Sequence, residues 1–174
     1  MCIRDRAEGA EVSVLDVSHD AGQAMIQDMS EKGYDVFFEQ ADLSKSKEIN
    51  AGIDAVLSKR GRIDTLFNHA GTIIVKPFHE MTEEEYDFLM DVNVRSAFFV
   101  TKRVVNHMME NGGGSIVITG SIASEKAFVY ESLYCITKCA TLMLSNSIAA
   151  EYREYGIRCN AVCPGFVKTA HGLR

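Results

Sequence analysis

Tyr134 and Lys138 lie four residues apart and form the pair with the clearest chemical potential in the sequence. On a helix this spacing places both side chains on one face, about one turn apart. A neighbouring ammonium group favours the ionised form of a phenol, which a tyrosine needs in order to act as a base near neutral pH. Taken alone the pair is a weak signal, because a tyrosine and a lysine meet at this spacing by chance on many surface helices.

A serine, Ser121, follows an apolar run thirteen residues before Tyr134. Residues 116–119 have the pattern of a buried strand, and open α/β sheets bind ligands beyond the carboxyl ends of their strands. Ser121 could therefore face a substrate. Without other support, a loop or helix-cap role is the more ordinary explanation for this serine.

Two asparagines occupy comparable positions. Asn68 opens the segment Asn-His-Ala-Gly after another apolar strand, and Asn93 lies inside a stretch with helical periodicity. Either one has an ordinary explanation, because Asn68 fits a turn and Asn93 could bond to nearby backbone.

The elements that must position these residues alternate along the chain. We expect strands at residues 11–15, 36–39, 63–67, 115–119 and 157–162, and helices around residues 49–57, 88–109 and 133–152. Gly33, Gly61 and Gly156 each end a helix directly before a strand. This alternation predicts βαβ units with a parallel sheet. No Pro-rich linker interrupts it, so we expect one domain over residues 1–174.

Composition excludes several function classes. The net charge of −6 disfavours a nucleic-acid interface, which needs clustered Lys and Arg. No apolar stretch approaches the roughly 20 residues that cross a bilayer. We therefore expect a cytoplasmic protein that binds neither nucleic acid nor membrane.

Cysteine spacing raises the question of a metal site. Cys135 with Cys139, and Cys159 with Cys163, form two C-x-x-x-C pairs. The second pair falls in a predicted strand, where four residues span about 13 Å, too far for two ligands of one tetrahedral ion. We expect reduced thiols and no metal.

In this order the motifs resemble the short-chain dehydrogenase/reductase family, in its simple dehydrogenase branch. The resemblance extends from about Ala7 to Thr169. It rests on Asn68-His69-Ala70-Gly71, Asn93, Ser121, the Tyr134-x-x-x-Lys138 pair, and the segment Asn160-Ala161-Val162-Cys163-Pro164-Gly165. It implies a Rossmann-like, doubly wound parallel sheet.

The resemblance also implies roles for four residues in oxidoreduction between a nicotinamide cofactor and a secondary alcohol or ketone. Tyr134 would be the general acid/base, and Lys138 would hold it partly ionised and contact the cofactor ribose. Ser121 would hydrogen-bond the substrate oxygen, and Asn93 would bind a water that links Lys138 to solvent. The family further suggests a homo-oligomer that acts on a small-molecule substrate.

Cofactor choice is expected to depend on Asp16, which closes the first visible strand. A carboxylate there accepts hydrogen bonds from the adenosine ribose and repels a 2′-phosphate, so NAD is favoured over NADP. The other positions that the resemblance assigns to the cofactor are Asp42, Leu43, Asn68, Ala70, Gly71, Tyr134, Lys138, Pro164, Gly165, Val167 and Thr169.

The resemblance fails at both ends of the chain. The family begins with a strand and a glycine-rich turn that are absent here, residues 1–6 match no family feature and are expected to be non-native, and the last strand is also missing. The absent first strand lies at the centre of the order 3-2-1-4-5-6. We therefore expect an incomplete sheet with unpaired strand edges, and a chain that alone folds poorly and binds NAD weakly.

Two other readings stay open. A catalytically inactive Rossmann-like binding or scaffold protein could keep the motifs, although it has no chemical need for Asn93, Ser121, Tyr134 and Lys138 together. An epimerase or dehydratase of the extended branch shares Tyr-x-x-x-Lys, but Asn68 and the Pro164-Gly165 segment look more like the simple dehydrogenases.

Overall fold

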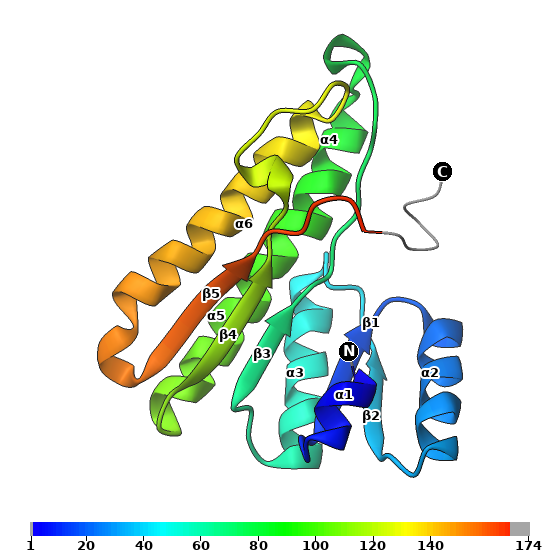
Figure 1. The fold of residues 1–174 in the computed structure, drawn as a ribbon, viewed down its shortest axis with the longest axis vertical. Coiled ribbons are helices and arrows are strands. Elements are labelled where there is room, and N and C mark those ends of the chain that lie inside the picture. Colours follow the sequence, from blue (N-terminus) through cyan, green and yellow to red (C-terminus); the bar gives the residue numbers. More distant parts are fainter. Residues whose placement is uncertain (1, 168–174) are drawn as a thin grey trace. The chain divides into compact units, whose positions relative to one another are not determined.

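The computed structural model describes residues 2–167, which divide between two compact units, Met1–Ile63 and Asp64–Arg174 (Figure 1). Each unit contains parallel strands followed by helices, as the alternating pattern predicts. Thr169, one of the predicted cofactor positions, lies outside the described residues. Because each unit has its own sheet, the single domain expected over the whole chain remains a prediction.

The first unit is a two-stranded parallel sheet with helices on both faces. Its elements are α1 (Cys2–Ala7), β1 (Val12–Asp16), α2 (His19–Glu31), β2 (Val36–Gln40) and α3 (Ser46–Arg60). β1 and β2 are in register from Val12 opposite Val36 to Asp16 opposite Gln40.

Two glycines bring the helices of this unit against its strands. A side chain at Gly22 of α2 would collide with the ring of Phe38 in β2, and one at Gly52 of α3 would press on Leu15 of β1. Phe38 pairs with Val14, the neighbour of Leu15, so Phe38 and Leu15 point to opposite faces of the sheet. α2 and α3 therefore cover opposite faces, which is the doubly wound arrangement.

The second unit is a three-stranded parallel sheet in the order β3-β4-β5. Its elements are β3 (Thr65–Asn68), η1 (Phe78–Glu80), α4 (Glu83–Met90), η2 (Asp91–Arg95), α5 (Ser96–Glu110), β4 (Gly114–Thr119), η3 (Ile122–Ser124), α6 (Ser132–Glu151), η4 (Arg153–Tyr155) and β5 (Ile157–Val162). All five predicted strands of the chain are confirmed, each within two residues of its expected start and end.

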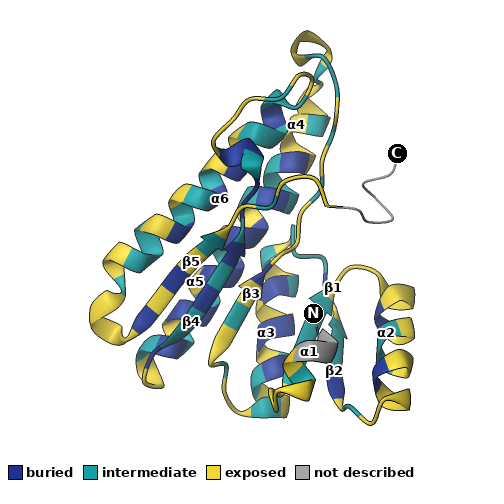
Figure 2. Ribbon diagram, viewed as in Figure 1, coloured by how far each residue is buried: buried dark blue, intermediate teal, exposed yellow. Residues whose placement is uncertain are grey.

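The core of the second unit lies between the sheet and α5 and α6. Ile116 and Ile118 alternate along β4 on its buried face, and Val104 and Met108 supply the buried face of α5 (Figure 2). Burial of such aliphatic side chains stabilises the unit by about 1.5–3 kcal/mol for each side chain. This packing fixes α6 beside β4, and three of the predicted catalytic residues, Ser121, Tyr134 and Lys138, lie on α6 or directly after β4.

The predicted helix over residues 88–109 differs from the structure in one respect. The chain forms two α-helices, α4 and α5, joined by a π-helical turn at Asp91–Arg95. Single π turns inside helices occur frequently at functional sites. Asn93, a predicted site residue, lies in the middle of this turn.

The hydrogen-bonded ladder among the described residues is broken between β1 and β3, since β1 pairs with β2 and β3 pairs with β4. The order 3-2-1-4-5-6 expected from the sequence places another strand between the counterparts of β1 and β3. The two partial sheets are therefore the ones expected of a Rossmann-like sheet without its central strand. Within residues 2–167, no helix is both long and apolar enough to cross a membrane.

Candidate active site

Helix α6 carries the predicted acid/base pair. The Lys138 ammonium donates a hydrogen bond of 3.0 Å to the carbonyl of Thr119, the last residue of β4. Its Nζ atom lies 5.7 Å from the centre of the Tyr134 ring. Lys138 is only 5% exposed, and this burial lowers the pKa of its ammonium, an effect that the nearby Cys163 partly opposes. A buried cation is thus held beside the phenol, as the spacing predicts.

Ser121 lies directly after β4 and caps the short helix η3. Its hydroxyl oxygen accepts a hydrogen bond of 3.1 Å from the backbone N–H of Ala123. An acceptor bond uses a lone pair, so the hydroxyl hydrogen can still donate to a substrate oxygen. The cap and a substrate contact are therefore compatible functions of this serine.

A second serine ties Ser121 to α6. The hydroxyl of Ser124 accepts from the backbone N–H of Ser121 at 3.2 Å and lies 2.9 Å from the carbonyl of Lys138, to which it donates. The backbone of Ser121 is therefore two hydrogen bonds away from the backbone of Lys138.

Asn93 is buried and its side-chain amide is fully engaged by protein groups. Oδ1 accepts from the Thr72 backbone N–H at 2.7 Å, and Nδ2 donates to the Thr72 carbonyl at 2.8 Å and to the Thr137 hydroxyl at 3.0 Å. The side chain thus joins the π turn to the loop after β3 and to α6. A water contact at Asn93 falls more naturally to its backbone, because the amide group is already occupied.

Asn68 ends β3, where the sequence predicts it to follow the strand. Its amide donates to the Ala97 carbonyl at 3.0 Å and to the Thr101 hydroxyl at 3.2 Å, both on α5. The side chain therefore fastens β3 to α5.

His69 and Gly120 stand where the family pattern favours other residues. The His69 ring lies 3.0 Å from the Thr119 hydroxyl and stacks on Phe67, and desolvation together with the charge of Lys138 lowers the pKa of the imidazole. A side chain at Gly120 would come within 2.8 Å of the Cys163 sulfur, so the glycine makes room for that cysteine.

The Pro164-Gly165 segment after β5 contacts the segment that follows Ser121. The carbonyl of Pro164 accepts from the backbone N–H of Ile122 at 2.9 Å, and Phe166 meets Phe128 edge-to-face at 6.0 Å. Gly165 and Val167 are exposed, and so is Ala70 after β3. The structure therefore places Pro164 next to the element that follows Ser121.

The predicted adenosine-end residues lie at the carboxyl ends of β1 and β2 in the first unit. The Asp16 carboxylate accepts from the Ser18 backbone N–H at 2.9 Å. Asp42, with Leu43, follows β2, and hydrogen bonds from Ser44 and then from Lys45 lower the pKa of its carboxyl group. The lowered pKa favours the ionised form of the Asp42 carboxyl group.

The described residues fit a nicotinamide cofactor in their chemistry. Asp16 offers a carboxylate acceptor suited to ribose hydroxyls, and Lys138 and Tyr134 offer a cation and a phenol. Gly71 lies beside Lys138: a side chain there would come within 3.5 Å of the Lys138 ammonium and 3.3 Å of the Asn93 amide oxygen. The glycine therefore keeps this space next to the ammonium free of a side chain.

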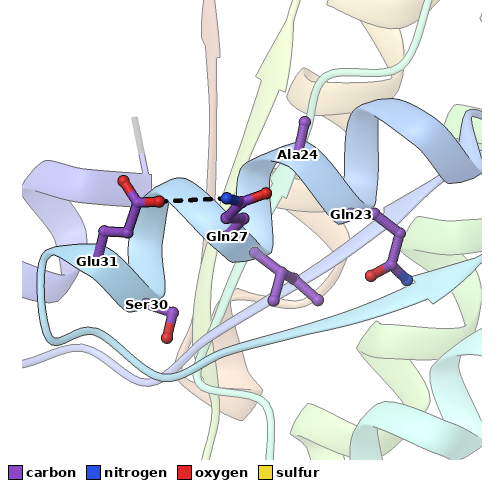
Figure 3. Close-up of a pocket in the computed structure, with 6 residues that line it drawn as sticks. Gln23, Ala24, Gln27, Ser30 and Glu31 are labelled. Atoms are coloured by element: carbon purple, nitrogen blue, oxygen red, sulfur yellow. Dashed lines mark hydrogen bonds between the residues drawn. The ribbon is translucent and has the colours of Figure 1, made fainter.

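A shallow hollow of the first unit lies elsewhere. Figure 3 shows it on one face of α2, and its lining consists of Gln23, Ala24, Ile26, Gln27, Ser30 and Glu31. It contains none of the predicted site residues, and Gln27 bonds to Glu31 across it at 3.2 Å. We assign it no part in the chemistry.

Three hydroxyl-bearing residues of the site were not predicted from the sequence. The Thr119 carbonyl accepts a hydrogen bond from Lys138, and the Thr119 hydroxyl contacts His69. Ser124 bridges Ser121 and Lys138, and Thr137 bonds to Asn93. Only Ser124 carries a local signal, because it stands three residues after the capping serine. The other two act across elements that are distant in sequence.

Comparison with known proteins agrees with this geometry. The family model described as short chain dehydrogenase matches residues 1–172. The chain is 34% identical to Oxidoreductase UcpA of Escherichia coli strain K12 over 162 residues, which are 92% of this chain and 61% of that protein. It is also 34% identical to levodione reductase of Leifsonia aquatica over 170 residues, 96% of this chain and 64% of that protein.

Solved structures give the same result. The crystal structure of levodione reductase superposes with a TM-score of 0.89 at 32% identity, covering 97% of this chain and 66% of that one. A gluconate 5-dehydrogenase from Burkholderia cenocepacia J2315, in complex with NADP and tartrate, also gives 0.89 at 29% identity, covering 95% and 66%. The chain thus has the Rossmann-like fold over less than two thirds of the length of these relatives, and it belongs to the short-chain dehydrogenase family.

Proposed function

We propose that the protein carrying this chain is a nicotinamide-dependent oxidoreductase that interconverts a secondary alcohol and a ketone, with Tyr134 as the general acid/base. The observation that carries the proposal is the Lys138 ammonium, buried against the end of β4 and 5.7 Å from the Tyr134 ring. A buried cation beside a phenol is costly unless its charge is used, and stabilising a phenolate uses it.

The residues would divide the chemistry as follows. The phenolic oxygen of Tyr134 takes the proton from an alcohol or returns it to a developing alkoxide. The hydroxyl of Ser121 donates a hydrogen bond to the same substrate oxygen where negative charge accumulates. A bound nicotinamide supplies the redox chemistry by accepting or donating hydride.

For the cofactor we propose NAD, because the Asp16 carboxylate at the end of β1 would repel a 2′-phosphate. The gluconate 5-dehydrogenase named above was crystallised with NADP, so a relative of the same fold binds the phosphorylated form. The remaining predicted contacts, including Asp42, Gly71 and Thr169, belong to the same proposal. We also propose a cytoplasmic homo-oligomer, as the family resemblance implies.

Calorimetric titration of NAD tests this proposal on two proteins. One is the 174-residue chain, and the other is the same chain completed with a family-typical first βα unit and C-terminal segment. We expect only the completed protein to bind. Tight NAD binding by the 174-residue chain alone would contradict the prediction that the incomplete sheet binds NAD weakly. A folded, completed protein that does not bind NAD would favour the inactive scaffold instead.

A further inference from the structure

We infer that Thr137 is a positioning residue for the acid/base pair, an inference that rests on the proposed function of Tyr134. Thr137 lies between Tyr134 and Lys138 on α6 and is completely buried. Its hydroxyl accepts from the Asn93 amide at 3.0 Å and donates to the carbonyl of Tyr134 at 2.8 Å.

The direction of these hydrogen bonds is fixed by the donors. The Asn93 Nδ2 group can only donate, so the Thr137 oxygen accepts from it and must use its own hydrogen for the Tyr134 carbonyl. The result is a chain of hydrogen bonds from the π turn to the backbone of the residue that carries the phenol. If the Thr137 hydroxyl turned away, the buried Asn93 amide would lose this acceptor.

The anchor of this chain is itself rigid. The Asn93 amide exchanges two hydrogen bonds with the backbone of Thr72, at 2.7 and 2.8 Å. A side chain at Gly71, the preceding residue, would touch both the Asn93 amide and the Lys138 ammonium. The same loop therefore adjoins the cation from one side and holds the phenol-bearing turn from the other, through Thr137.

Thr141, another buried threonine on α6, makes the ordinary local hydrogen bond of a helical threonine. The Thr141 hydroxyl donates to the Lys138 carbonyl three residues earlier at 3.0 Å, in the same local geometry as Thr137 to Tyr134. Such bonds to the preceding turn are common in helices. What distinguishes Thr137 is the bond that it receives from Asn93, on a different element. Thr141→Val is therefore the matched control for loss of a buried hydroxyl from this helix.

The test compares Thr137→Val, which removes the hydroxyl, with Thr137→Ser, which keeps it. With NAD and a secondary alcohol, we expect Thr137→Val to lower kcat roughly tenfold, because the turn that carries the phenol loses its tie to Asn93 and a small misplacement of a catalytic group slows the reaction. KM should change little, and Thr137→Ser should restore kcat.

A second readout needs no turnover. The ultraviolet spectrum of the apoprotein minus that of Tyr134→Phe isolates the absorbance of this one phenol, and Thr137→Val should change this difference spectrum because the environment of the phenol changes. Thr137→Ala, which adds no new contact, gives a second variant without the hydroxyl.

Three results would overturn the inference: an unchanged difference spectrum, failure of the serine to rescue kcat, or an equal loss in Thr141→Val. Full activity of Tyr134→Phe would instead overturn the proposed function, and the difference spectrum would still decide the role of Thr137.

Discussion

The Nζ atom of Lys138 lies 5.7 Å from the centre of the Tyr134 ring, while its hydrogen bond goes to the carbonyl of Thr119. The ammonium is thus held by the end of the strand and not by the phenol itself. Under the proposed function, this arrangement would leave the phenolic oxygen able to exchange a proton with a substrate while the cation stays in place.

Ser121→Ala should lower kcat by about a hundredfold to a thousandfold, the usual effect of removing one donor to a developing oxyanion. It should also cost about 1 kcal/mol of stability through loss of the helix cap. Ser18→Ala is the matched control, because Ser18 caps α2 in the same way, accepting from Ala21 at 3.3 Å. If the two variants lose activity equally, Ser121 is only a cap. Steady-state kinetics and thermal melts measure both effects.

Asn93→Ala should destabilise the protein by roughly 2–4 kcal/mol, because it leaves buried groups of Thr72 and Thr137 without partners. Asn111 provides the contrast, since it is exposed and bonds to the His107 carbonyl within one helix turn. Asn111→Ala should change the free energy of unfolding by no more than about 0.5 kcal/mol. Urea denaturation distinguishes the two. A similar small loss for both variants would mean that the Asn93 network is not a structural tie.

The His69 pair with Thr119 predicts a pH-dependent contribution to stability. Desolvation and the charge of Lys138 lower the pKa of His69 below its ordinary value of 6.5, so the folded protein binds fewer protons here than the unfolded chain. Stability therefore rises with pH up to the unfolded pKa, and is lost as pH falls through that value toward the folded one.

His69→Asn removes this titration and leaves the other groups in place. The free energy of unfolding of the wild type relative to His69→Asn should therefore decrease between pH 7.5 and pH 5.5, values chosen to bracket roughly the ordinary histidine pKa. Denaturation curves at several pH values measure it. A constant difference across this range would show that the His69 pKa is the same in both states.

Asp16→Ala should narrow the preference for NAD over NADP by about tenfold, since it removes the charge that repels the 2′-phosphate. Asp20→Ala is the control, because Asp20 is another exposed carboxylate four residues further along the same unit. Calorimetry with both nucleotides, on a form of the protein that binds NAD, gives the ratio. An unchanged ratio in Asp16→Ala would place cofactor discrimination elsewhere.

The strands and the placement of Tyr134 near Lys138 on one helix could be predicted from the sequence because their signals are local. Apolar alternation located β4, and the spacing of Tyr134 and Lys138 placed them on one helical face. The π turn at Asp91–Arg95 could not be predicted in this way. It interrupts a continuous helical periodicity, and its central Asn93 is held by Thr72 and Thr137, which only tertiary structure brings near.

The hydroxyl network escaped prediction for a related reason. Ser124 and Thr137 are residues with many ordinary roles in helices, and their bonds to Lys138 and Asn93 connect different elements. The sequence also assigned Asn68 to the cofactor and Asn93 to a bound water, and both assignments stay predictions. What the structure adds is that the side-chain amides of both residues tie separate elements together.

The most direct test of the account is the turnover of simple secondary alcohols by the NAD-binding protein and by its Tyr134→Phe variant, followed through the absorbance of the reduced nicotinamide. The phenylalanine keeps the ring beside Lys138 and removes only the oxygen that exchanges the proton. We predict that Tyr134→Phe still binds NAD and loses turnover by a factor of at least about a hundred. Turnover near the wild-type rate in this variant would contradict the assignment of Tyr134 as the acid/base.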